Sequence, residues 1–215
     1  LSIRRQRQMC IRDRNMNKRT PAYLVLKSAV LFLSLLCFYP LSATNPQKKE
    51  MKELNVKKVS LANVAVENIP ALLDKEKVAF QSINTVNWKA FPYQPEVQFR
   101  IAHTDDAILV HYKVKEASVR AVATGDNGAV WEDACVEFFS IPAGDGIYYN
   151  VECNCVGTLL IGAGGGRSNR EHAPQEVMDK VQRWSSLGRE SFEERVGECL
   201  SLIHISEPTR HSLIS

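Results

Sequence analysis

Hydrophobic and polar residues alternate along several short stretches in the middle of the chain. Residues 97–103 and 108–114 carry apolar side chains at about every second position, and Thr104-Asp105-Asp106 forms a polar break between them. Because the side chains of a β-strand point to opposite faces in turn, this pattern predicts a β-hairpin. Two more strands are predicted at residues 135–139 and 148–156, separated by a turn rich in Pro and Gly.

The second pair of predicted strands places its polar side chains on a single face. Val136 and Phe138 point toward the expected core, so Glu137 points the other way. Asn150 and Glu152 alternate with apolar neighbours in the same manner. Antiparallel pairing would bring Glu137 beside this amide and this carboxyl group. Repeated short strands with few helical stretches predict an all-β protein, an antiparallel β-sandwich.

One segment favours a helix instead of a strand. Residues 174–187 would place four apolar side chains on one helical face: Val177, Met178, Val181 and Trp184. We expect a surface helix or an extended loop that packs on the sandwich. Trp88 and Trp184 are expected to be packing residues.

Trp131 precedes the first polar strand, in a loop flanked by polar residues on both sides. An aromatic ring can cover the apolar face of a pyranose while nearby polar groups bind its hydroxyls. The candidate carbohydrate-binding residues are Trp131, Glu137, Asn150 and Glu152. Two alternatives remain open from the residues alone: a core position for Trp131, and an ion pair between Glu137 and Arg100.

The run from Trp131 to Phe139, Trp-Glu-Asp-Ala-Cys-Val-Glu-Phe-Phe, resembles the signature of family 9 carbohydrate-binding modules and their DOMON-like relatives. The similarity spans about residues 87–198. It implies a jelly-roll type β-sandwich without catalytic residues that binds plant-type polysaccharide, such as xylan or cellulose, often at chain ends. In that family, a tryptophan and a glutamate match Trp131 and Glu137. A second tryptophan comes from near the C-terminus, but none follows Trp184 here, so we expect a C-terminally truncated domain.

Both ends of the chain look foreign to the protein. Back-translation of residues 4–13 and 200–210 gives nucleotide stretches that are reverse complements of each other, and both resemble transposase adapters used in sequencing. We therefore exclude residues 1–14 and 199–215 from the predicted fold and expect them to make no stable tertiary contacts. The alternative is a basic amphipathic arm at the N-terminus.

Residues 16–43 have the layout of a secretory signal peptide, with basic residues, an apolar stretch and a small residue, Ala43, before the expected cleavage. Lys27 interrupts the apolar stretch, which argues against a membrane span. Leu36 before Cys37 argues against a lipoprotein. The sequence thus predicts an extracytoplasmic protein, periplasmic or secreted. Residues 44–86 would form a tether and the first strand or strands.

Charge and cysteine content narrow the possible functions. The net charge of +3 depends on the five arginines of the first 14 residues, so nothing in the remainder favours nucleic acid. Cys135, Cys153 and Cys155 are the cysteines of the mature chain. We expect small buried residues, although an oxidising compartment permits a bridge from Cys135 to either of the others. A Cys-x-Cys metal site would lack its remaining ligands.

Other functions find weaker support in the sequence. The glycine-rich residues 162–168 lack the pattern of a nucleotide-binding loop, so a flexible hairpin loop is expected. No cofactor is expected, with structural calcium left open at acids without EF-hand spacing: Asp105, Asp106, Asp126 and Asp145. Haem binding by a DOMON-like electron carrier is one alternative, with possible axial ligands Met178, His103, His111 and His172.

A further alternative is that the chain is a fragment of a larger glycoside hydrolase. Such an enzyme needs a pair of carboxyl groups, and the sequence offers Glu132, Asp133, Glu137 and Glu152 without a recognisable arrangement. The predicted function is therefore non-catalytic carbohydrate binding in polysaccharide catabolism. The sequence leaves the particular sugar and the oligomeric state open.

Overall fold

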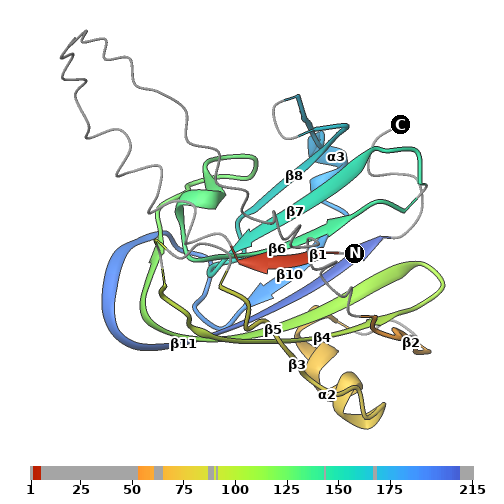
Figure 1. Ribbon diagram of the computed structural model, residues 1–215, viewed down its shortest axis with the longest axis horizontal. Helices are drawn as coiled ribbons and strands as arrows, with labels where there is room; N and C mark the ends of the chain where they lie inside the picture. Colours follow the sequence, from red (N-terminus) through yellow and green to blue (C-terminus); the bar gives the residue numbers. More distant parts are fainter. Residues whose placement is uncertain are drawn as a thin grey trace, which may run out of the picture.

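The computed structural model contains two β-sheets that pack face to face (Figure 1). The residues it describes are 2–5 (backbone only), 53–60, 65–86, 90, 92–142, 144–166 and 169–208. Trp88 and the predicted signal peptide lie outside them. Within these residues, no helix is long and apolar enough to cross a membrane.

The larger sheet has six strands in the order β10-β11-β5-β4-β2, with β3 also paired to β4. Its strands are β2 (Lys57–Lys58), β3 (Gln81–Ser82), β4 (Glu96–His103), β5 (Ala107–Ala121), β10 (Gln182–Ser185) and β11 (Phe192–Pro208). β4 and β5 form the predicted hairpin. Thr104 closes its turn, because its hydroxyl oxygen accepts hydrogen bonds from the backbone N–H groups of Asp106 and Ala107 at 3.1 and 2.9 Å.

The smaller sheet has five strands in the order β1-β6-β7-β8-β9, all antiparallel to their neighbours. Its strands are β1 (Ser2–Arg5), β6 (Cys135–Ser140), β7 (Tyr148–Asn154), β8 (Leu159–Gly164) and β9 (Glu171–His172). β6 and β7 are the two strands on which the sequence places the candidate polar residues, and they pair as predicted.

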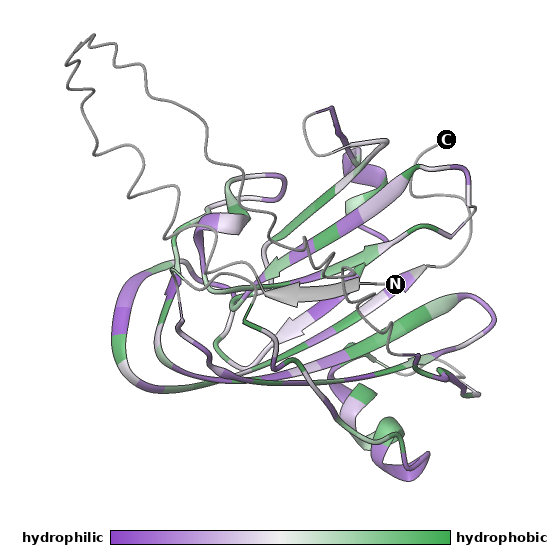
Figure 2. Cartoon of the chain, in the orientation of Figure 1, coloured by the Kyte–Doolittle hydropathy of each residue, from purple (hydrophilic) through white to green (hydrophobic). Residues whose placement is uncertain are grey.

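The hydrophobic core fills the space between the two sheets. Val110 and Tyr112 of β5 pack with Val136 and Phe138 of β6 and with Val151 of β7. None of these side chains is more than 4% exposed, and full burial of one such side chain contributes roughly 1.5–3 kcal/mol. Figure 2 shows hydrophobic and hydrophilic residues alternating along these strands. The prediction of an antiparallel β-sandwich is confirmed.

A short helix, α2 (Ile69–Lys75), follows the 3-10 turn η1 (Val66–Asn68) and covers the outer side of the six-stranded sheet (Figure 1). Pro70 stands in its first turn, where a missing N–H leaves no intrahelical hydrogen bond unmade. Ile69 and Leu73 lie one turn apart and pack against Leu109 on the outward face of β5. The outer side of this sheet therefore carries a small apolar cluster of its own.

The helix predicted for residues 174–187 is wrong except for one turn. Only α3 (Gln175–Met178) is helical, whereas residues 182–185 form β10 and pair with β11. Val177, Met178 and Val181 are buried in the core, as the apolar spacing indicated. The remaining residues adopt a strand because pairing with β11 supplies backbone hydrogen bonds that override a weak local helical preference.

The expectation that both chain ends lie outside the fold is also wrong in this structure. Residues 2–5 form β1 along the edge of β6, and residues 200–208 form the second half of β11, paired with β5. Ser201, Ile203 and Ile205 occupy alternate buried positions, so the segment carries the period of a strand whatever its origin. The foreign origin of these residues stays a prediction.

Candidate functional site

A cluster of polar side chains lies on the outward face of the five-stranded sheet. Glu137 of β6 stands directly opposite Glu152 of β7 in the antiparallel register. Residues in such positions have Cβ atoms about 5 Å apart, so the two side chains are neighbours. Asn150 donates a hydrogen bond from its Nδ2 to Glu152 Oε1 at 2.7 Å. We call Glu137, Asn150 and Glu152 the polar row.

The polar row is almost fully buried. Glu137, Asn150 and Glu152 are 2%, 0% and 1% exposed. Removing acidic groups from water is costly, so they need polar neighbours, and Arg170 Nη1 lies 3.9 Å from Glu152 Oε1. The carboxyl and amide groups of the polar row are therefore closed off from solvent in this structure.

Arg100, the alternative partner considered for Glu137, lies elsewhere. It stands on the outer face of the six-stranded sheet and forms an ion pair with Asp74 of α2. The two outward faces are on opposite sides of the sandwich, so the alternative of an ion pair between Glu137 and Arg100 is wrong. The strand period predicted the direction of both side chains but not which sheet each strand joins.

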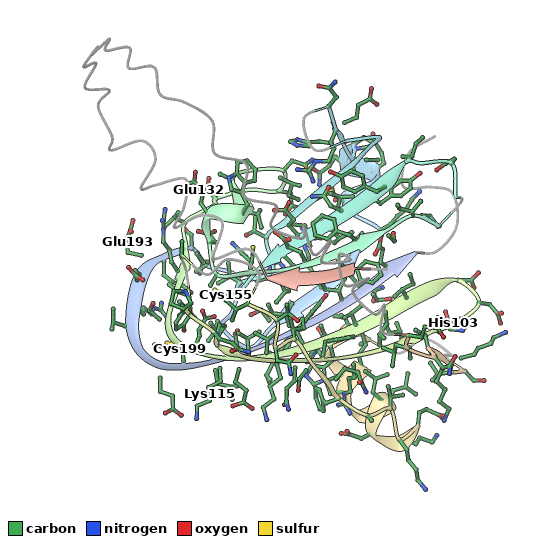
Figure 3. All side chains as sticks on the ribbon, viewed as in Figure 1. His103, Lys115, Glu132, Cys155, Glu193 and Cys199 are labelled. Carbon is green, nitrogen blue, oxygen red and sulfur yellow. The ribbon has the colours of Figure 1, made fainter. Side chains whose placement is uncertain are left out.

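Trp131 lies in η2 (Val130–Glu132), a 3-10 turn that precedes β6, and its side chain is 37% exposed. Its neighbour Glu132 is also exposed (Figure 3). Val130 is buried against Cys135 and Leu160, which point outward from β6 and β8. η2 therefore rests on the same outward face as the polar row, and the alternative of a core position for Trp131 does not hold. From Cys135, Glu137 is two residues farther along β6, roughly 7 Å.

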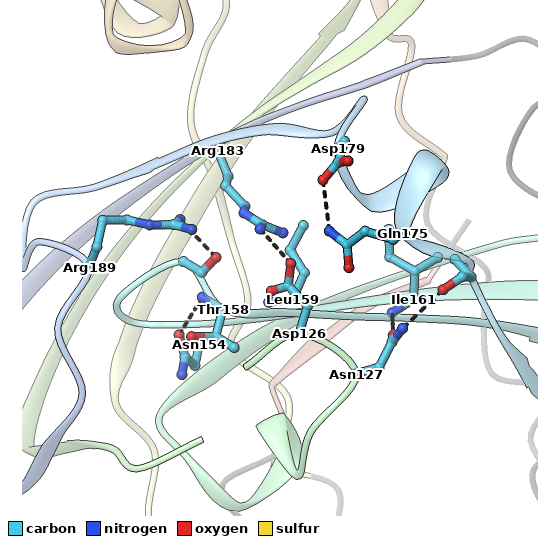
Figure 4. Close-up of polar contacts among 12 residues, drawn as sticks. Asp126, Asn127, Asn154, Thr158, Leu159, Ile161, Gln175, Asp179, Arg183 and Arg189 are labelled. Carbon is cyan, nitrogen blue, oxygen red and sulfur yellow. Dashed lines mark hydrogen bonds and ion pairs between the residues drawn. The ribbon is translucent and has the colours of Figure 1, made fainter. Parts of the chain in front are cut away.

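Hydrogen bonds fix the loop that leads to Trp131 (Figure 4). Asp126 accepts a hydrogen bond from the backbone of β8 at 3.0 Å and forms an ion pair with Arg183 at 2.5 Å. Asn127 accepts from the backbone of β8 at 3.3 Å and donates to the Ala173 carbonyl at 3.0 Å. A platform that is held in place before binding loses little conformational freedom when a ligand arrives.

Asp133 holds the start of β6 in place. Its carboxylate accepts hydrogen bonds from the backbone N–H groups of Val122 and Ala123 at 2.9 and 3.0 Å, and from Asn154 Nδ2 at 3.0 Å. With these partners Asp133 has a structural role between β5 and β7. It is therefore a poor candidate for the second carboxyl group of a hydrolase.

Comparison with known proteins agrees with this geometry. Residues 67–209, well over half of the chain, match the carbohydrate-binding family 9. The chain belongs to that family. A crystal structure at 2.70 Å resolution of a protein from Bacteroides uniformis ATCC 8492, provisionally named carbohydrate-binding, is similar with 58% identity and a TM-score of 0.71, over 73% of this chain and 72% of that chain. No curated protein matches the chain.

The family 9 match adds to the boundaries expected from the sequence. It begins inside η1, so α2 and β3 lie within the matched region together with residues 87–198. It also includes residues 199–209, which form the end of β11 and the residue after it. All of the candidate binding residues fall inside the matched region.

Three further residues of this family 9 domain lie beside the polar row, and the sequence did not lead us to expect them there. Phe139 and Tyr148 lie on the same outward face, with ring centroids 6.2 Å apart. Arg170 places its guanidinium carbon 5.9 Å from the Tyr148 ring. Strand alternation could have identified Phe139 and Tyr148. Arg170 follows a turn, where no sequence period fixes the direction of a side chain.

Metal and haem sites find no support among the described residues of the family 9 domain. No group of three or more His, Cys, Asp or Glu side chains there is arranged to hold a metal ion. Asp126, one of the calcium candidates, instead binds Arg183. Met178 is buried between the sheets, whereas His111 lies on the outer face of its sheet, so these two candidate haem ligands do not converge.

The three cysteines of the predicted mature domain are free thiols. Cys135 points outward under η2, while Cys153 lies in the core between the sheets. Cys155 lies inside the sandwich as well (Figure 3). Burial raises the pKa of Cys153 and of Cys155 to about 12, so both thiols stay protonated and unreactive.

Proposed function

We propose that the protein binds plant-type polysaccharide, xylan or cellulose, on the outward face of the five-stranded sheet and does not cleave it. The observation that carries this proposal is the position of Trp131, exposed on the same face as Glu137, Asn150 and Glu152. An aromatic ring can pack on the apolar face of a pyranose, and the carboxyl and amide groups beside it can hydrogen-bond the hydroxyl groups of the sugar. Membership of a carbohydrate-binding family supports the class of ligand.

The arrangement of the acids supports binding without catalysis. A glycosidase places two carboxyl groups on either side of the scissile bond, so that one can donate a proton while the other attacks or activates water. Glu137 and Glu152 instead stand side by side on one sheet face, and both are buried. Their geometry suits acceptance of hydrogen bonds from neighbouring hydroxyl groups.

We also propose that the natural protein is extracytoplasmic, that cleavage follows Ala43, and that the natural chain continues beyond Glu198. These proposals rest on the signal-like residues 16–43 and on the codon pattern of the two ends. The continuation would supply the second aromatic platform that the family resemblance implies. We therefore expect the printed chain to bind sugars more weakly than the mature protein.

Calorimetry on the mature protein with its natural continuation tests the proposal. We expect binding to xylo- or cello-oligosaccharides, and Trp131→Ala or Glu137→Gln should each weaken it roughly tenfold or more, because each removes a direct contact. Glu132→Gln and Ile141→Ala are matched controls, since both side chains are exposed outside the polar row. Unchanged affinity in both site variants would place the site elsewhere.

A further inference from the structure

Beside the polar row, two glycines leave part of β8 without side chains. We call this part of β8 the strip, and the Arg170 side chain lies over it. Gly162 and Gly164 occupy outward-facing positions of β8, opposite Asn150 and Tyr148 of β7. A Cβ atom on Gly164 would lie 3.3 Å from the Arg170 side chain, and one on Gly162 would lie 3.5 Å from Arg170 Cβ. The two glycines therefore leave the space in which the Arg170 side chain lies against the sheet and reaches toward Tyr148 and Glu152.

Two groups beside this strip, Asn150 Oδ1 and the Arg170 guanidinium, make no hydrogen bond to the described residues. Asn150 is fully buried, and its Oδ1 accepts no hydrogen bond. That oxygen points toward Gly162, since a Cβ there would lie only 2.8 Å from it. The guanidinium of Arg170 makes no hydrogen bond to any of the described residues; its closest acidic contact is Glu152 at 3.9 Å. A buried acceptor without a donor lowers the stability of the fold. Here the acceptor lies close to Arg170, whose N–H groups make no hydrogen bond to the described residues.

We infer that Arg170 and Asn150 form a second part of the proposed sugar site and together bind hydroxyl groups of a neutral sugar. A hydroxyl group is the chemistry that fits, because it can donate to Asn150 Oδ1 and accept from Arg170. Neighbouring hydroxyls on one sugar ring are spaced to serve both. This inference rests on the proposed function of the same face.

The acidic side chains around the strip disfavour an acidic sugar. Glu137 and Glu152 place two acidic side chains near the guanidinium of Arg170. A uronate carboxylate could accept from Arg170, but it would have no proton to donate to Asn150 Oδ1 and would lie near two further acidic groups. The site therefore selects neutral sugars, and Arg170 serves as a hydroxyl donor and not as an anion-binding group.

Two site variants and one control test this inference on the mature protein with its natural continuation. Arg170→Gln removes the guanidinium. Gly162→Ala adds a Cβ that must push the Asn150 amide aside. Arg195→Gln is the control, because Arg195 also lies over an aromatic ring, Phe192, with its guanidinium carbon 3.7 Å from the ring centroid, but in β11. Circular dichroism confirms that each variant is folded, and calorimetry measures binding of xylotetraose, cellotetraose and tetragalacturonate.

We expect Arg170→Gln and Gly162→Ala each to lower affinity for the neutral tetrasaccharides roughly tenfold, the loss of one well-placed hydrogen bond. Arg195→Gln should change nothing, and tetragalacturonate should give no measurable binding. Normal affinity in both site variants overturns this inference, while loss in Trp131→Ala would still uphold the proposed function. Binding of tetragalacturonate as tight as that of the neutral sugars overturns the selectivity. Absence of binding to every neutral sugar by the unaltered protein overturns both proposals.

Discussion

Glu207 is a carboxyl group on the inward side of β11. It follows Ile203 and Ile205 at alternate positions and is 6% exposed. Burial raises its pKa from the ordinary 4.5 to about 7. Close by on the outward side of the strand, His204 is buried against Trp184, and burial lowers its pKa to about 4. Burial therefore favours the uncharged form of both groups in this short segment.

Glu207→Gln should stabilise the protein, increasingly so at higher pH. The folded pKa of Glu207 is about 7 and the ordinary value is 4.5, so the folded state holds a proton that the unfolded state releases. The contribution of Glu207 to stability is therefore greatest below pH 4.5 and is lost as the pH rises through 7. Glutamine stays neutral, so the gain should reach roughly 3 kcal/mol at pH 8. Urea unfolding at pH 4, 6 and 8 measures it, with exposed Glu193→Gln as the control; a gain that does not vary with pH would contradict the assignment.

At the residue scale, the sequence predicted which face each side chain of β6 and β7 takes. Glu137, Asn150 and Glu152 share one face because a strand repeats every two residues, and that rule depends on nothing distant. Their burial could not be predicted, since it depends on how the folded chain packs around them. Arg170 escaped prediction for the same reason: only the folded sheet places it over Gly162.

Arg100 joins α2 to the six-stranded sheet. Its Nε donates to His111 Nδ1 at 3.1 Å, Nη1 pairs with Asp74 at 2.5 Å, and Nη2 donates to the Pro70 carbonyl at 3.1 Å. Burial, followed by the charges of His204 and Arg100, lowers the pKa of His111 to about 3. The imidazole is therefore neutral and can accept the hydrogen bond. One buried side chain thus connects β4, β5 and α2.

Arg100→Met should destabilise the protein by roughly 2–4 kcal/mol, because it breaks a buried network and leaves His111 without its donor. Lys115→Met is the matched control. Lys115 pairs with Glu198 at 2.7 Å on the surface, with both side chains largely exposed, so its loss should cost less than about 1 kcal/mol. Chemical denaturation of the two variants compares them. Equal losses would show that α2 is not held by Arg100.

At the element scale, prediction succeeded where alternation was long and failed where a segment was short. β4 and β5 carry clear alternation over several residues, and their hairpin was predicted with its turn. Residues 174–187 contain apolar positions that suit a helix and also suit a turn followed by a strand. Only the presence of β11 beside them decides between the two, and local sequence does not contain that information.

At the scale of the whole molecule, we expect β1 to be the strand whose removal destabilises the sandwich least. It contributes four residues from the N-terminus to the edge of β6. The fold that we expected from the resemblance to family 9 modules did not include these residues. Removing residues 1–43 should leave the rest of the sandwich folded, because the core residues of β5, β6 and β7 remain. It should also remove Arg4, which stands opposite Glu137 in the register, from beside the polar row.

The melting temperature of the chain that starts at Thr44 should therefore lie within a few degrees of that of the full 215-residue chain. The shorter chain should also bind neutral oligosaccharides more tightly. Thermal circular dichroism and calorimetry on the two forms measure these properties. A fall in melting temperature of more than about 10 °C, the effect of roughly 2 kcal/mol or more in a domain of this size, would show that β1 is an integral strand. Equal affinity in both forms would show that the N-terminal residues do not restrict the site.

β11 follows every other described strand in the sequence, yet it lies inside its sheet between β10 and β5. Its pairing joins residues 107–121 to residues 192–208, so the larger sheet cannot close until the residues of β11 have left the ribosome. Proteins that depend on such distant pairings fold slowly. If the protein is exported as proposed above, this delay would keep the chain unfolded while it passes through a translocation channel.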